Sequence, residues 1–452
     1  MGLGLLGRGL GYTKFLAECG ANLIVTDLKT KTQLATSVKE LGRFKNPEGK
    51  STSYGAGIKF VFGKHRLEDF RNRDMIIKSA GVPLDSIYIK EAQKNKIPVE
   101  MDVSLFAKCA PGVEIVGVTG TRGKSMTTAL IYEILKKNEK SLKRSGSPIG
   151  LCPRVYIGGN VRGVATLPLL KKVKTGDILV CELDSWQLQG FGDAKISPHI
   201  SVFISFMPDH MNYYKNNMKK YFADKANIFK YQKENDVLII RPDIKKLIPR
   251  NIKSKLLIAG TKEVNKYKFV VPGEHQRGNL ACAVKVAEQF HIPKSRIIKA
   301  VKNFKGIEGR LQYVKTIKGV KIYNDNNATT PEATIAGIKA LVSPTPGVGE
   351  RKIVLVCGGS DKKLDLTNLV KTINKYCKAV IMIPGTGTSV LLKNYKIKIP
   401  NKVGKNLKDI MKKTIKYAKK GDTILFSPAF ASFGMFNNEY ERGDLFMKII
   451  KS

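Results

Sequence analysis

Short apolar runs alternate with longer amphipathic stretches along most of the 452-residue chain. An apolar run bounded by polar or glycine-rich residues is typical of a buried strand, and apolar positions at helical spacing are typical of a helix packed on one face. Strands that alternate with helices favour parallel sheets covered by helices. The pattern therefore predicts an α/β fold, and the length predicts more than one domain.

The order of these elements divides the chain into three expected domains, residues 1–108, 109–306 and 307–452. In the first we expect strands at 22–26, 59–62, 75–79 and near 99, with helices at 12–19 and 87–95. In the second we expect strands at 113–118, 178–181 and 200–206, with helices from about 125, at 218–231 and at 279–290. In the third we expect a hairpin at 313–323, strands at 353–356, 379–383 and 423–426, and helices at 331–341, 364–376 and 407–418.

The chain opens with the glycine pattern G-x-G-x-x-G at Gly2–Gly7, and Asp27 lies twenty residues after Gly7. Glycines followed by a helix, with an acid after the next strand, indicate a dinucleotide-type fold. The strand that usually precedes these glycines is reduced to Met1. We therefore expect unpaired strand edges and an apolar groove, and either an upstream start of the gene or a gain in stability when five to eight residues are added.

A second glycine loop, Gly120-Thr-Arg-Gly-Lys-Ser125, follows the expected strand 113–118 and precedes a helix. Backbone N–H groups and the positive end of a helix point at an anion in such a loop, and Lys124 adds a charge. Ser125 lies where a hydroxyl ligates the Mg²⁺ of a nucleotide triphosphate. The strict pattern has glycine at the position of Val118. The loop thus predicts phosphate binding of an unusual type.

Further polar residues lie at strand ends, where α/β proteins place their sites. Glu182 ends the strand 178–181 and is a natural second anchor for Mg²⁺, although a surface acid is the alternative. His210, beside Asp209, can ligate a metal or serve structure alone, and Lys225 follows fifteen residues later. Gly158-Gly-Asn160 either approaches a ligand with its backbone or forms a plain turn.

In the third region, the polar loop Asn324–Thr330 runs into a helix at Pro331, and Thr330 is a good helix cap whatever else the loop does. Small or polar residues follow two strands, at Gly358–Lys363 and at Ser427–Ser432. Small residues let a ligand approach the backbone closely. We therefore expect a second ligand site in this region.

Composition adds three constraints. The seven cysteines form no Cys-x-x-Cys pair, which favours a reducing cytoplasm. No apolar run approaches the roughly 18 residues that cross a membrane. The net charge of +42 is spread over the whole chain without a basic block. It therefore favours a lysine-rich proteome over nucleic-acid binding, although it would attract anionic nucleotides.

Taken in order, these clusters resemble the Mur ligase family, and within it the branch that adds D-glutamate. Gly120–Ser125 resembles the motif G-T-N-G-K-S/T with Arg122 in place of Asn, and Glu182–Leu188 resembles E-L-S-S-F-Q-L with Asp184 and Trp186 as departures. Asp209, His210 and Lys225 match the spacing of the D-H…K motif.

The resemblance continues to the C-terminus. Gly273–Asn279 is similar to G-x-H-N-x-x-N with Gln276 for the first Asn, and Arg310 ends a match to F-x-G-x-x-H-R in which Gly309 replaces His. Asp325–Thr329 is similar to D-S-K-A-T with Asn327 in place of Lys. The residues that resemble the D-glutamate branch specifically are Lys362, Ser427–Ser432, Asn438 and Glu441–Gly443.

The resemblance implies three domains: a Rossmann-like UDP-binding domain, a central P-loop ATPase-type domain with a parallel sheet, and a Rossmann-like amino-acid-binding domain. It implies an ATP-dependent, ADP-forming ligase that joins D-glutamate to UDP-N-acetylmuramoyl-L-alanine through an acyl phosphate, in peptidoglycan precursor synthesis. It implies ATP, two Mg²⁺ ions and a carbamylated Lys225 as cofactors. We expect a cytoplasmic monomer without membrane insertion.

The resemblance also implies site residues. Catalysis is expected from Lys124, Glu182, His210 and Lys225, and metal binding from Ser125, Glu182, His210 and Lys225. ATP is expected at Gly120, Thr121, Gly123, Lys124, Ser125, Met126, Asn279, Arg310 and Asp325. The UDP-sugar is expected at Leu5, Leu6, Asp27, Leu28, Ser79 and Asn160, and the amino acid at Thr329, Lys362 and Ser432.

Two alternatives stay open from the sequence. One is a sister enzyme, either another Mur-type ligase or a relative of folylpolyglutamate synthase; the glycine pattern with Asp27 favours a UDP-sugar over folate. The other is a nucleotide-regulated protein that binds polyanions. The net charge alone favours it, and it does not explain Glu182, His210 and Lys225 together.

Overall fold

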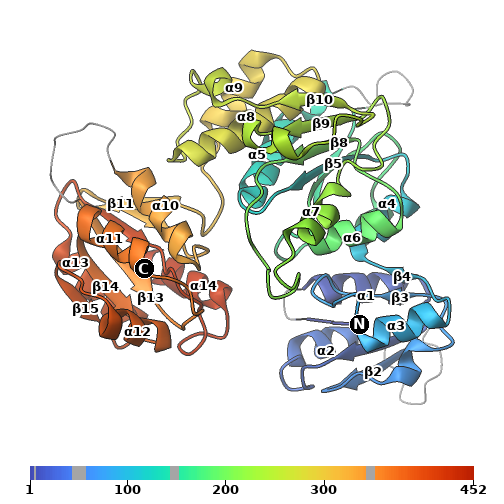
Figure 1. Cartoon of the computed structure of the whole chain (residues 1–452), viewed down its shortest axis with the longest axis horizontal. Helices are drawn as coiled ribbons and strands as arrows, with labels where there is room; N and C mark the ends of the chain where they lie inside the picture. Colours follow the sequence, from blue (N-terminus) through green and yellow to red (C-terminus); the bar gives the residue numbers. More distant parts are fainter. Residues whose placement is uncertain (5–6, 43–56, 143–151, 343–351, 452) are drawn as a thin grey trace. The chain divides into compact units, whose positions relative to one another are not determined.

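The computed structural model describes residues 1–4, 7–42, 57–142, 152–342 and 352–451. The chain forms two compact units. The first unit combines Met1–Lys266 with Gly278–Ala300, and the second combines Tyr267–Arg277 with Val301–Ser452. Each unit is built on mainly parallel sheets packed against helices, so the α/β fold expected from the pattern is confirmed (Figure 1).

The first unit holds ten strands in its described residues. They are β1 (Leu23–Asp27), β2 (Ile58–Phe62), β3 (Ile76–Ile77), β4 (Val99–Glu100), β5 (Glu114–Thr119), β6 (Val155–Gly159), β7 (Ile178–Glu182), β8 (Ile200–Phe203), β9 (Val237–Ile240) and β10 (Lys255–Ile258). Its α-helices are α1 (Arg8–Glu18), α2 (Ala35–Leu41), α3 (Ile87–Lys94), α4 (Asp102–Cys109), α5 (Lys124–Lys137), α6 (Ser185–Asp193) and α7 (Met218–Ala226). Short 3-10 helices are η2 (Leu67–Phe70), η3 (Glu139–Ser141), η4 (Leu167–Lys171), η5 (Pro242–Leu247) and η6 (Thr261–Val264). Two further helices, α8 (Glu274–Gln289) and α9 (Lys294–Lys302), run across the division between the units.

A six-stranded parallel sheet forms the centre of the first unit, in the order β10-β9-β8-β5-β7-β6. Its strands are continuous apolar runs because both of their faces are covered. Apolar side chains of α4, α6 and α7 pack into one core with β5, β7 and β8. All six strands run parallel, so their carboxyl ends meet along one edge, and β5 reaches that edge between β7 and β8.

The N-terminal part of the same unit holds two separate two-stranded parallel sheets, β1-β2 and β3-β4. The backbone of Met1 and Gly2 lies between them. The Gly2 N–H donates to Thr26 O at 2.8 Å, and the Met1 amino group donates to Ile77 O at 2.8 Å. This short segment therefore bridges β1 and β3 only at their carboxyl ends.

Behind that bridge lies a groove of about 220 Å³ between β1 and β3. Its lining is mainly apolar and includes Leu3, Leu16, Leu23, Val25, Phe70 and Ile76. Within the described residues β1 pairs with β2 alone, apart from the contact of Gly2. The apolar groove expected beside the glycine pattern is therefore confirmed.

The N-terminal part is attached to the central sheet by directed contacts. Asp102 begins α4, and its carboxylate accepts the N–H groups of Thr166 and Leu167 at 2.9 and 2.7 Å. Lys171 forms an ion pair with Glu18 of α1 at 2.7 Å. The carboxylate of Asp102 thus satisfies two N–H groups at the start of η4, which would otherwise have no partner in a buried place.

The second unit holds six strands and five helices in its described residues. The strands are β11 (Gln312–Ile317), β12 (Val320–Asn324), β13 (Ile353–Gly358), β14 (Cys377–Ile383), β15 (Asn401–Val403) and β16 (Thr423–Phe426). The helices are α10 (Pro331–Leu341), α11 (Thr367–Tyr376), α12 (Thr386–Asn394), α13 (Leu407–Tyr417) and α14 (Glu439–Lys451). Thr330 caps α10 as expected, since its hydroxyl accepts the Ala333 N–H and Pro331 is the first helical residue.

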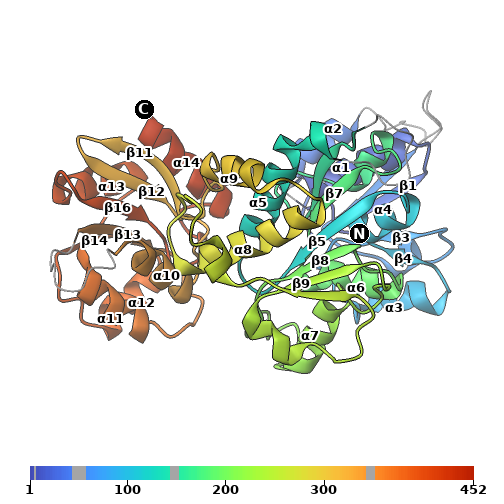
Figure 2. The same cartoon turned by 90° about the horizontal axis from the view of Figure 1, so that it is seen from above.

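One sheet forms the centre of the second unit, in the order β11-β12-β16-β13-β14-β15. The pair β11-β12 is the expected antiparallel hairpin, and the other pairs are parallel. Apolar residues of α10, α11 and α12 form a core on one face, and those of α13 and α14 form a core on the other (Figure 2).

Several expected elements differ from the structure in length, among them one strand and two helices. The strand expected at 200–206 ends at Phe203, because the next residues turn along the glycine loop and Ser205 Oγ bonds the Arg122 backbone. The helix expected at 218–231 ends at Ala226, because Ser197 and Ser201 take the carbonyls of Asn227 and Ile228. The helix expected at 279–290 begins five residues earlier, at Glu274.

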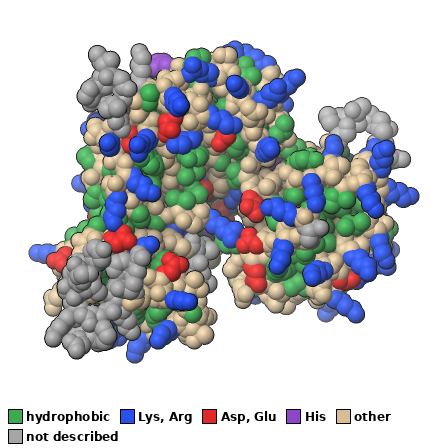
Figure 3. All heavy atoms as spheres, turned by 180° about the vertical axis from the view of Figure 1, so that it is seen from behind, with side chains coloured by type: hydrophobic (Ala, Val, Ile, Leu, Met, Phe, Trp, Pro, Cys, Tyr) green, Lys and Arg blue, Asp and Glu red, His purple; other side chains and the backbone are tan. Residues whose placement is uncertain are grey.

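The surface carries lysine and arginine side chains scattered over both units rather than gathered in one patch on the face that Figure 3 shows. In the parts of the chain that are described, no helix has the length and apolar character needed to cross a membrane. All seven cysteines lie in described residues, and each is a free thiol.

Candidate active site

The glycine loop between β5 and α5 closes over the carboxyl edge of the central sheet. Gly123 has a φ of +90°, which a side chain would strain, and a Cβ there would lie 2.5 Å from Asn279 Oδ1. Asn279 of α8 therefore packs directly against the loop. Lys124 is the first residue of α5, and its ammonium donates to Gly120 O at 2.9 Å and Thr121 O at 3.3 Å.

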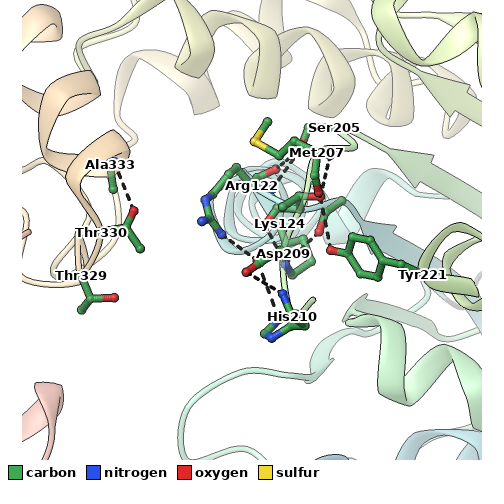
Figure 4. Close-up of polar contacts among 12 residues, drawn as sticks. Arg122, Lys124, Ser205, Met207, Asp209, His210, Tyr221, Thr329, Thr330 and Ala333 are labelled. Carbon is green, nitrogen blue, oxygen red and sulfur yellow. Dashed lines mark hydrogen bonds and ion pairs between the residues drawn. The ribbon is translucent and has the colours of Figure 1, made fainter. Parts of the chain in front are cut away.

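Two neighbouring segments brace this loop. The Thr121 hydroxyl lies 3.1 Å from Met207 O and 3.3 Å from the Tyr221 hydroxyl, and the Thr121 N–H donates to Ser205 O at 2.9 Å (Figure 4). The segment after β8 and the helix α7 thus hold the loop from one side. Tyr221 and Ser205 were not among the expected site residues, and only their contacts in space identify them.

Lys225 lies in the last turn of α7, and its side chain is 1% exposed. Its ammonium nitrogen lies 3.1 Å from Gly120 O and 4.9 Å from the centre of the Tyr221 ring. Burial, together with the nearby charge of Lys124, lowers the pKa of Lys225 to about 7. The structure therefore places the expected Lys225 directly beneath the glycine loop.

Glu182 ends β7 and is 4% exposed. It pairs with Val118 in the register of β7 with β5, and Val118 lies two residues before Gly120. The carbonyl of Glu182 accepts the Asn160 N–H at 2.7 Å, and Gly159 packs so closely on it that a Cβ would lie 2.1 Å away. Glu182, expected to bind Mg²⁺, and Asn160, expected to bind the UDP-sugar, are thus neighbours at one edge of the sheet.

The segment after β8 carries Asp209 and His210 on the outer side of the loop. Arg122 Nη1 donates to Asp209 Oδ2 at 2.9 Å, and His210 Nε2 lies 3.7 Å from the same oxygen (Figure 4). The Trp186 ring contacts the His210 ring, with centroids 4.6 Å apart and the ring planes tilted by 49°. Burial lowers the pKa of His210, so neutral imidazole, the form that binds metals, is favoured.

The expected Mg²⁺ sites can be tested against these donors. In the described ranges no three His, Cys, Asp or Glu side chains gather closely enough to hold a metal ion. Mg²⁺ beside a nucleotide is usually held by one or two protein oxygens, with phosphates and water completing the shell. The Ser125 hydroxyl and the Glu182 carboxylate are oxygen donors of that kind, so they fit an ion that arrives with the phosphates.

The expected UDP-sugar residues lie at the N-terminal glycines, except Asn160. Asp27 is buried, and its carboxylate accepts the Gly4 N–H at 2.8 Å and the Lys29 N–H at 2.9 Å, so it shapes the loop. The Ser79 hydroxyl bonds Gly2 O and lies 3.2 Å from the Tyr12 hydroxyl. Leu28 is 67% exposed. Leu5 and Leu6 lie outside the described residues.

In the second unit, Asp325 follows β12 and is buried. Its carboxylate accepts the Leu311 N–H at 3.0 Å and the Ser427 hydroxyl at 2.8 Å. Burial raises the pKa of Asp325 to about 7, against these two bonds and the charge of Arg310. The structure thus brings Asp325 to the start of the segment Ser427–Ser432, and Arg310 itself is exposed.

The expected amino-acid residues come from three loops of the second unit. Lys362 Nζ donates to the Thr329 hydroxyl at 3.0 Å, so the structure brings these two together. Ser432 is buried, and its neighbour Ala431 pairs with Ser360 across an isolated bridge. All three loops lie at the carboxyl edge of the sheet, because they follow β12, β13 and β16.

Two departures from the family pattern, Gly309 and Asn327, lie in direct contact. The Asn327 N–H donates to Gly309 O at 2.9 Å, and a Cβ on Gly309 would lie 3.0 Å from Asn327 Nδ2. The φ of Gly309 is +71°, a conformation that favours glycine. Positions 309 and 327 thus both hold a smaller residue than the family pattern has, and the two smaller residues contact each other.

The fold and the geometry of this site define the class of protein. It is an α/β protein with a glycine loop of the phosphate-binding type at the carboxyl end of a central parallel strand. Comparison with known proteins then gives the family. Residues 118–270 match the Mur ligase middle domain, and residues 309–430 match the Mur ligase glutamate ligase domain.

Full-length relatives agree. The UDP-N-acetylmuramoylalanine–D-glutamate ligase of Borreliella burgdorferi strain ZS7 is 34% identical over 475 residues, covering 100% of this chain and 97% of that protein. The enzyme of the same name from Roseiflexus is 31% identical over 490 residues, covering 100% of this chain and 97% of that protein. The chain therefore belongs to the Mur ligase family.

Solved structures share the fold at lower sequence identity. The UDP-N-acetylmuramate-alanine ligase of Thermotoga maritima superposes with a TM-score of 0.60 at 16% identity, covering 100% of this chain and 98% of that one. The MurF ligase of Thermotoga maritima, solved in complex with ADP, gives a TM-score of 0.56 at 20% identity, covering 85% of this chain and 97% of that one. These matches support the overall α/β architecture.

Proposed function

We propose that this protein is the ATP-dependent ligase that joins D-glutamate to UDP-N-acetylmuramoyl-L-alanine, with release of ADP and phosphate, in peptidoglycan precursor synthesis. The observation that carries the proposal is the glycine loop with Lys124 in it and the buried Lys225 beneath it, 3.1 Å from Gly120 O. Relatives of at least 31% identity that bear this activity in their names support it over the full length.

The reaction has two steps. A carboxylate oxygen of the UDP-linked substrate attacks the γ-phosphorus of ATP, the bond from that phosphorus to the β–γ bridging oxygen breaks, and ADP leaves. The amine of D-glutamate then attacks the acyl carbon, the bond from that carbon to the phosphate oxygen breaks, and the amine loses a proton. No covalent bond to the protein forms, so the protein contributes by positioning and by neutralising charge.

Each group of residues has a part in these steps. The N–H groups of Gly120–Ser125 and the start of α5 hold the triphosphate, and Lys124 leaves its carbonyl contacts to neutralise the transferred phosphoryl group. Ser125 and Glu182 would hold one Mg²⁺ ion, and His210 with Lys225 would hold the other. When bound, Mg²⁺ would help to neutralise the charge on the phosphates.

The proposal includes a carbamate on Lys225. A lysine must be neutral to take up CO₂, and the lowered pKa of the buried Lys225 amine supplies the neutral form near pH 7. A carbamate is an anion with two oxygens, so it can ligate Mg²⁺ where an ammonium cannot.

The remaining assignments belong to the same proposal. We assign Gly120–Met126, Asn279, Arg310 and Asp325 to ATP, and Thr329, Lys362 and Ser432 to D-glutamate. The UDP-sugar lies at the N-terminal glycines with Asp27, Leu28, Ser79 and Asn160. We propose domains 1–108, 109–306 and 307–452 and a cytoplasmic monomer; the scattered free thiols are in keeping with a reducing compartment.

The test is phosphate release with purified protein, ATP, Mg²⁺ and a panel of acceptors and amines. D-glutamate with UDP-N-acetylmuramoyl-L-alanine is expected to give the fastest release, and Lys124→Ala to give none above background. Faster release with L-glutamate and a folate acceptor, or with L-alanine or a diamino acid, would replace the proposed substrate. Release by Lys124→Ala at the rate of the unchanged protein would refute the role of the loop.

A further inference from the structure

Arg442, in the first turns of α14, is the largest side chain that is fully buried, with 0% of it exposed. Its guanidinium contacts three oxygens. Nε donates to Asn326 Oδ1 at 2.8 Å, Nη2 donates to Asn326 O at 2.9 Å, and Nη1 donates to Phe430 O at 3.4 Å. All three acceptors belong to neutral groups.

These contacts join two loops that are far apart in the sequence. Asn326 lies between Asp325 and Asn327, in the loop that leads to Thr329, and Phe430 lies in the segment that leads to Ser432. The same loop is fastened to α14 a second time, because Asn326 Nδ2 donates to Glu439 O at 2.6 Å. One side chain therefore fixes the position of one expected substrate loop against the other.

Packing alone does not explain why a charged side chain occupies this buried position. A buried guanidinium is costly unless it is hydrogen-bonded, and an apolar side chain of similar size would fill the same place at less cost. The burial also lowers the pKa of Arg442 to about 10, against the attraction of Glu439. What an apolar side chain cannot supply is the planar fork of donors that holds two carbonyls and an amide in fixed directions.

Both loops make further contacts beyond those of Arg442. Thr329 receives the Lys362 ammonium at 3.0 Å, and Ala328 O accepts the Ala429 N–H at 2.8 Å. Asp325 receives the Ser427 hydroxyl at 2.8 Å. The two loops thus touch at several points along their length, and Arg442 clamps them from the side of α14.

We propose that Arg442 is a positioning residue for the amino-acid substrate: it holds the loop Asp325–Thr329 in register with the segment Ser427–Ser432, so that Thr329, Lys362 and Ser432 present one binding site. This rests on the proposed function, which assigns those three residues to D-glutamate. The guanidinium itself touches no substrate, since it is completely enclosed by the protein.

The experiment measures steady-state phosphate release with each substrate varied in turn. The variants are Arg442→Lys, Arg442→Met, Arg442→Ala and Asn326→Ala. The matched control is Phe446→Leu, which alters a buried side chain of the same helix that stacks on Phe426 and not on either loop. A second readout is rescue of Arg442→Ala by guanidinium ion at concentrations that leave the unchanged protein folded.

We expect Arg442→Met and Asn326→Ala to raise the KM for D-glutamate about tenfold or more, because each loses charge-assisted bonds. Arg442→Lys should recover part of the loss. The KM for the UDP-linked substrate, assigned to the first unit, should stay within about twofold. Phe446→Leu should lower the melting temperature without a selective rise in the KM for D-glutamate. Guanidinium should partly reverse the rise in the KM for D-glutamate in Arg442→Ala.

Equal changes in all three KM values, or a D-glutamate KM in both Arg442→Met and Asn326→Ala within twofold of the unchanged protein, would overturn the proposal. If Arg442→Met does not fold, Arg442→Lys and Asn326→Ala decide. If the unchanged protein prefers another amine, the proposed function fails, and the same variants are then measured with that amine, which tests Arg442 separately.

Discussion

The surroundings of Lys225 in the folded protein differ from those that its position in a lysine-rich helix suggests. A lysine in a helix with several other lysines is normally a solvated surface residue. Here it is buried between Tyr221 and the carbonyl of Gly120, and its pKa is lowered to about 7. The sequence indicated this lysine only through the family spacing after His210, because nothing in its own helix distinguishes it from Lys219 or Lys220.

The carbamate gives a prediction for Lys225. Lys225→Ala should be nearly inactive, and a short-chain carboxylic acid or high bicarbonate should partly restore phosphate release by supplying the missing anion. In the unchanged protein, activity should fall as the pH drops below about 7, because the protonated amine cannot take up CO₂. Lys220→Ala, an exposed lysine of the same helix, is the control. Full activity of Lys225→Ala would show that the carbamate is not needed.

Asp325 gives a prediction about stability. Its folded pKa, raised to about 7, lies above the model-peptide value of about 3.9. The folded state therefore binds the proton more tightly, so the contribution of Asp325 to stability is present at low pH and is lost as the pH rises through about 7. Asp325→Asn stays neutral and keeps its contribution.

The measurement is the melting temperature from pH 5 to pH 8. The difference in melting temperature, Asp325→Asn minus the unchanged protein, should increase across this range. Asp243→Asn, an exposed position in the first unit, should show no such trend. A difference that is flat or falls with pH would mean that Asp325 is ionised in the folded state throughout.

At the scale of elements, the two small N-terminal sheets, β1-β2 and β3-β4, are separated by an apolar groove. Within the described residues, the backbone hydrogen bonds that link β1 to β3 run through Met1 and Gly2, and the groove behind them is lined by apolar side chains such as Leu3, Val25 and Ile76. Exposed strand edges and apolar surface both cost free energy relative to a paired and covered strand. The glycine pattern alone indicated this feature, because such glycines normally follow a buried strand.

An apolar β-forming segment of about five to eight residues, added ahead of Met1, should therefore raise the melting temperature by several degrees. It should also tighten binding of a UDP-sugar, because the glycine loop is then held from both sides. The control is an added Gly/Ser segment of equal length, which can enter no apolar groove. Equal melting temperatures and equal UDP-sugar affinities for the two extended proteins would refute the prediction.

At the scale of the whole molecule, the net charge of +42 is the property that no single site explains. The lysines and arginines are scattered, as Figure 3 shows for one face, so they create a diffuse positive field. Every proposed substrate is an anion. The field should therefore speed the encounter with substrates and have little effect on the chemical step.

The prediction follows from screening. Raising the KCl concentration above about 0.15 M, where the Debye length is about 8 Å, should lower kcat/KM for ATP and the UDP-linked substrate more than it lowers kcat. Sucrose at matched osmolarity serves as the control, because it does not screen charge. Equal losses in kcat and kcat/KM would mean that salt acts on the fold or on the chemical step, and not on the encounter with the substrates.

The sequence by itself determined the alternation of strands and helices, the hairpin β11-β12, the glycine loop and the cap at Thr330, because these depend on residues close together in the chain. It did not identify the strands β6, β9, β10 and β15, nor the helices α2, α4, α6, α9, α12 and α14. Short apolar runs are ambiguous until neighbouring strands pair with them. Where helix α7 ends was equally hidden, since Ser197 and Ser201, from another segment, bond the carbonyls of the two residues that follow it.

Only the tertiary structure decided which of the expected site residues meet. It placed Lys225 beneath Gly120, Asn160 beside Glu182, and Lys362 on Thr329, and it packed the departures Gly309 and Asn327 together. It also turned Arg442, a charged residue in a polar stretch of sequence, into the enclosed link between two loops. These facts depend on which strand ends share an edge of a sheet, and that follows from the order of strands in space, which the local pattern of a sequence does not contain.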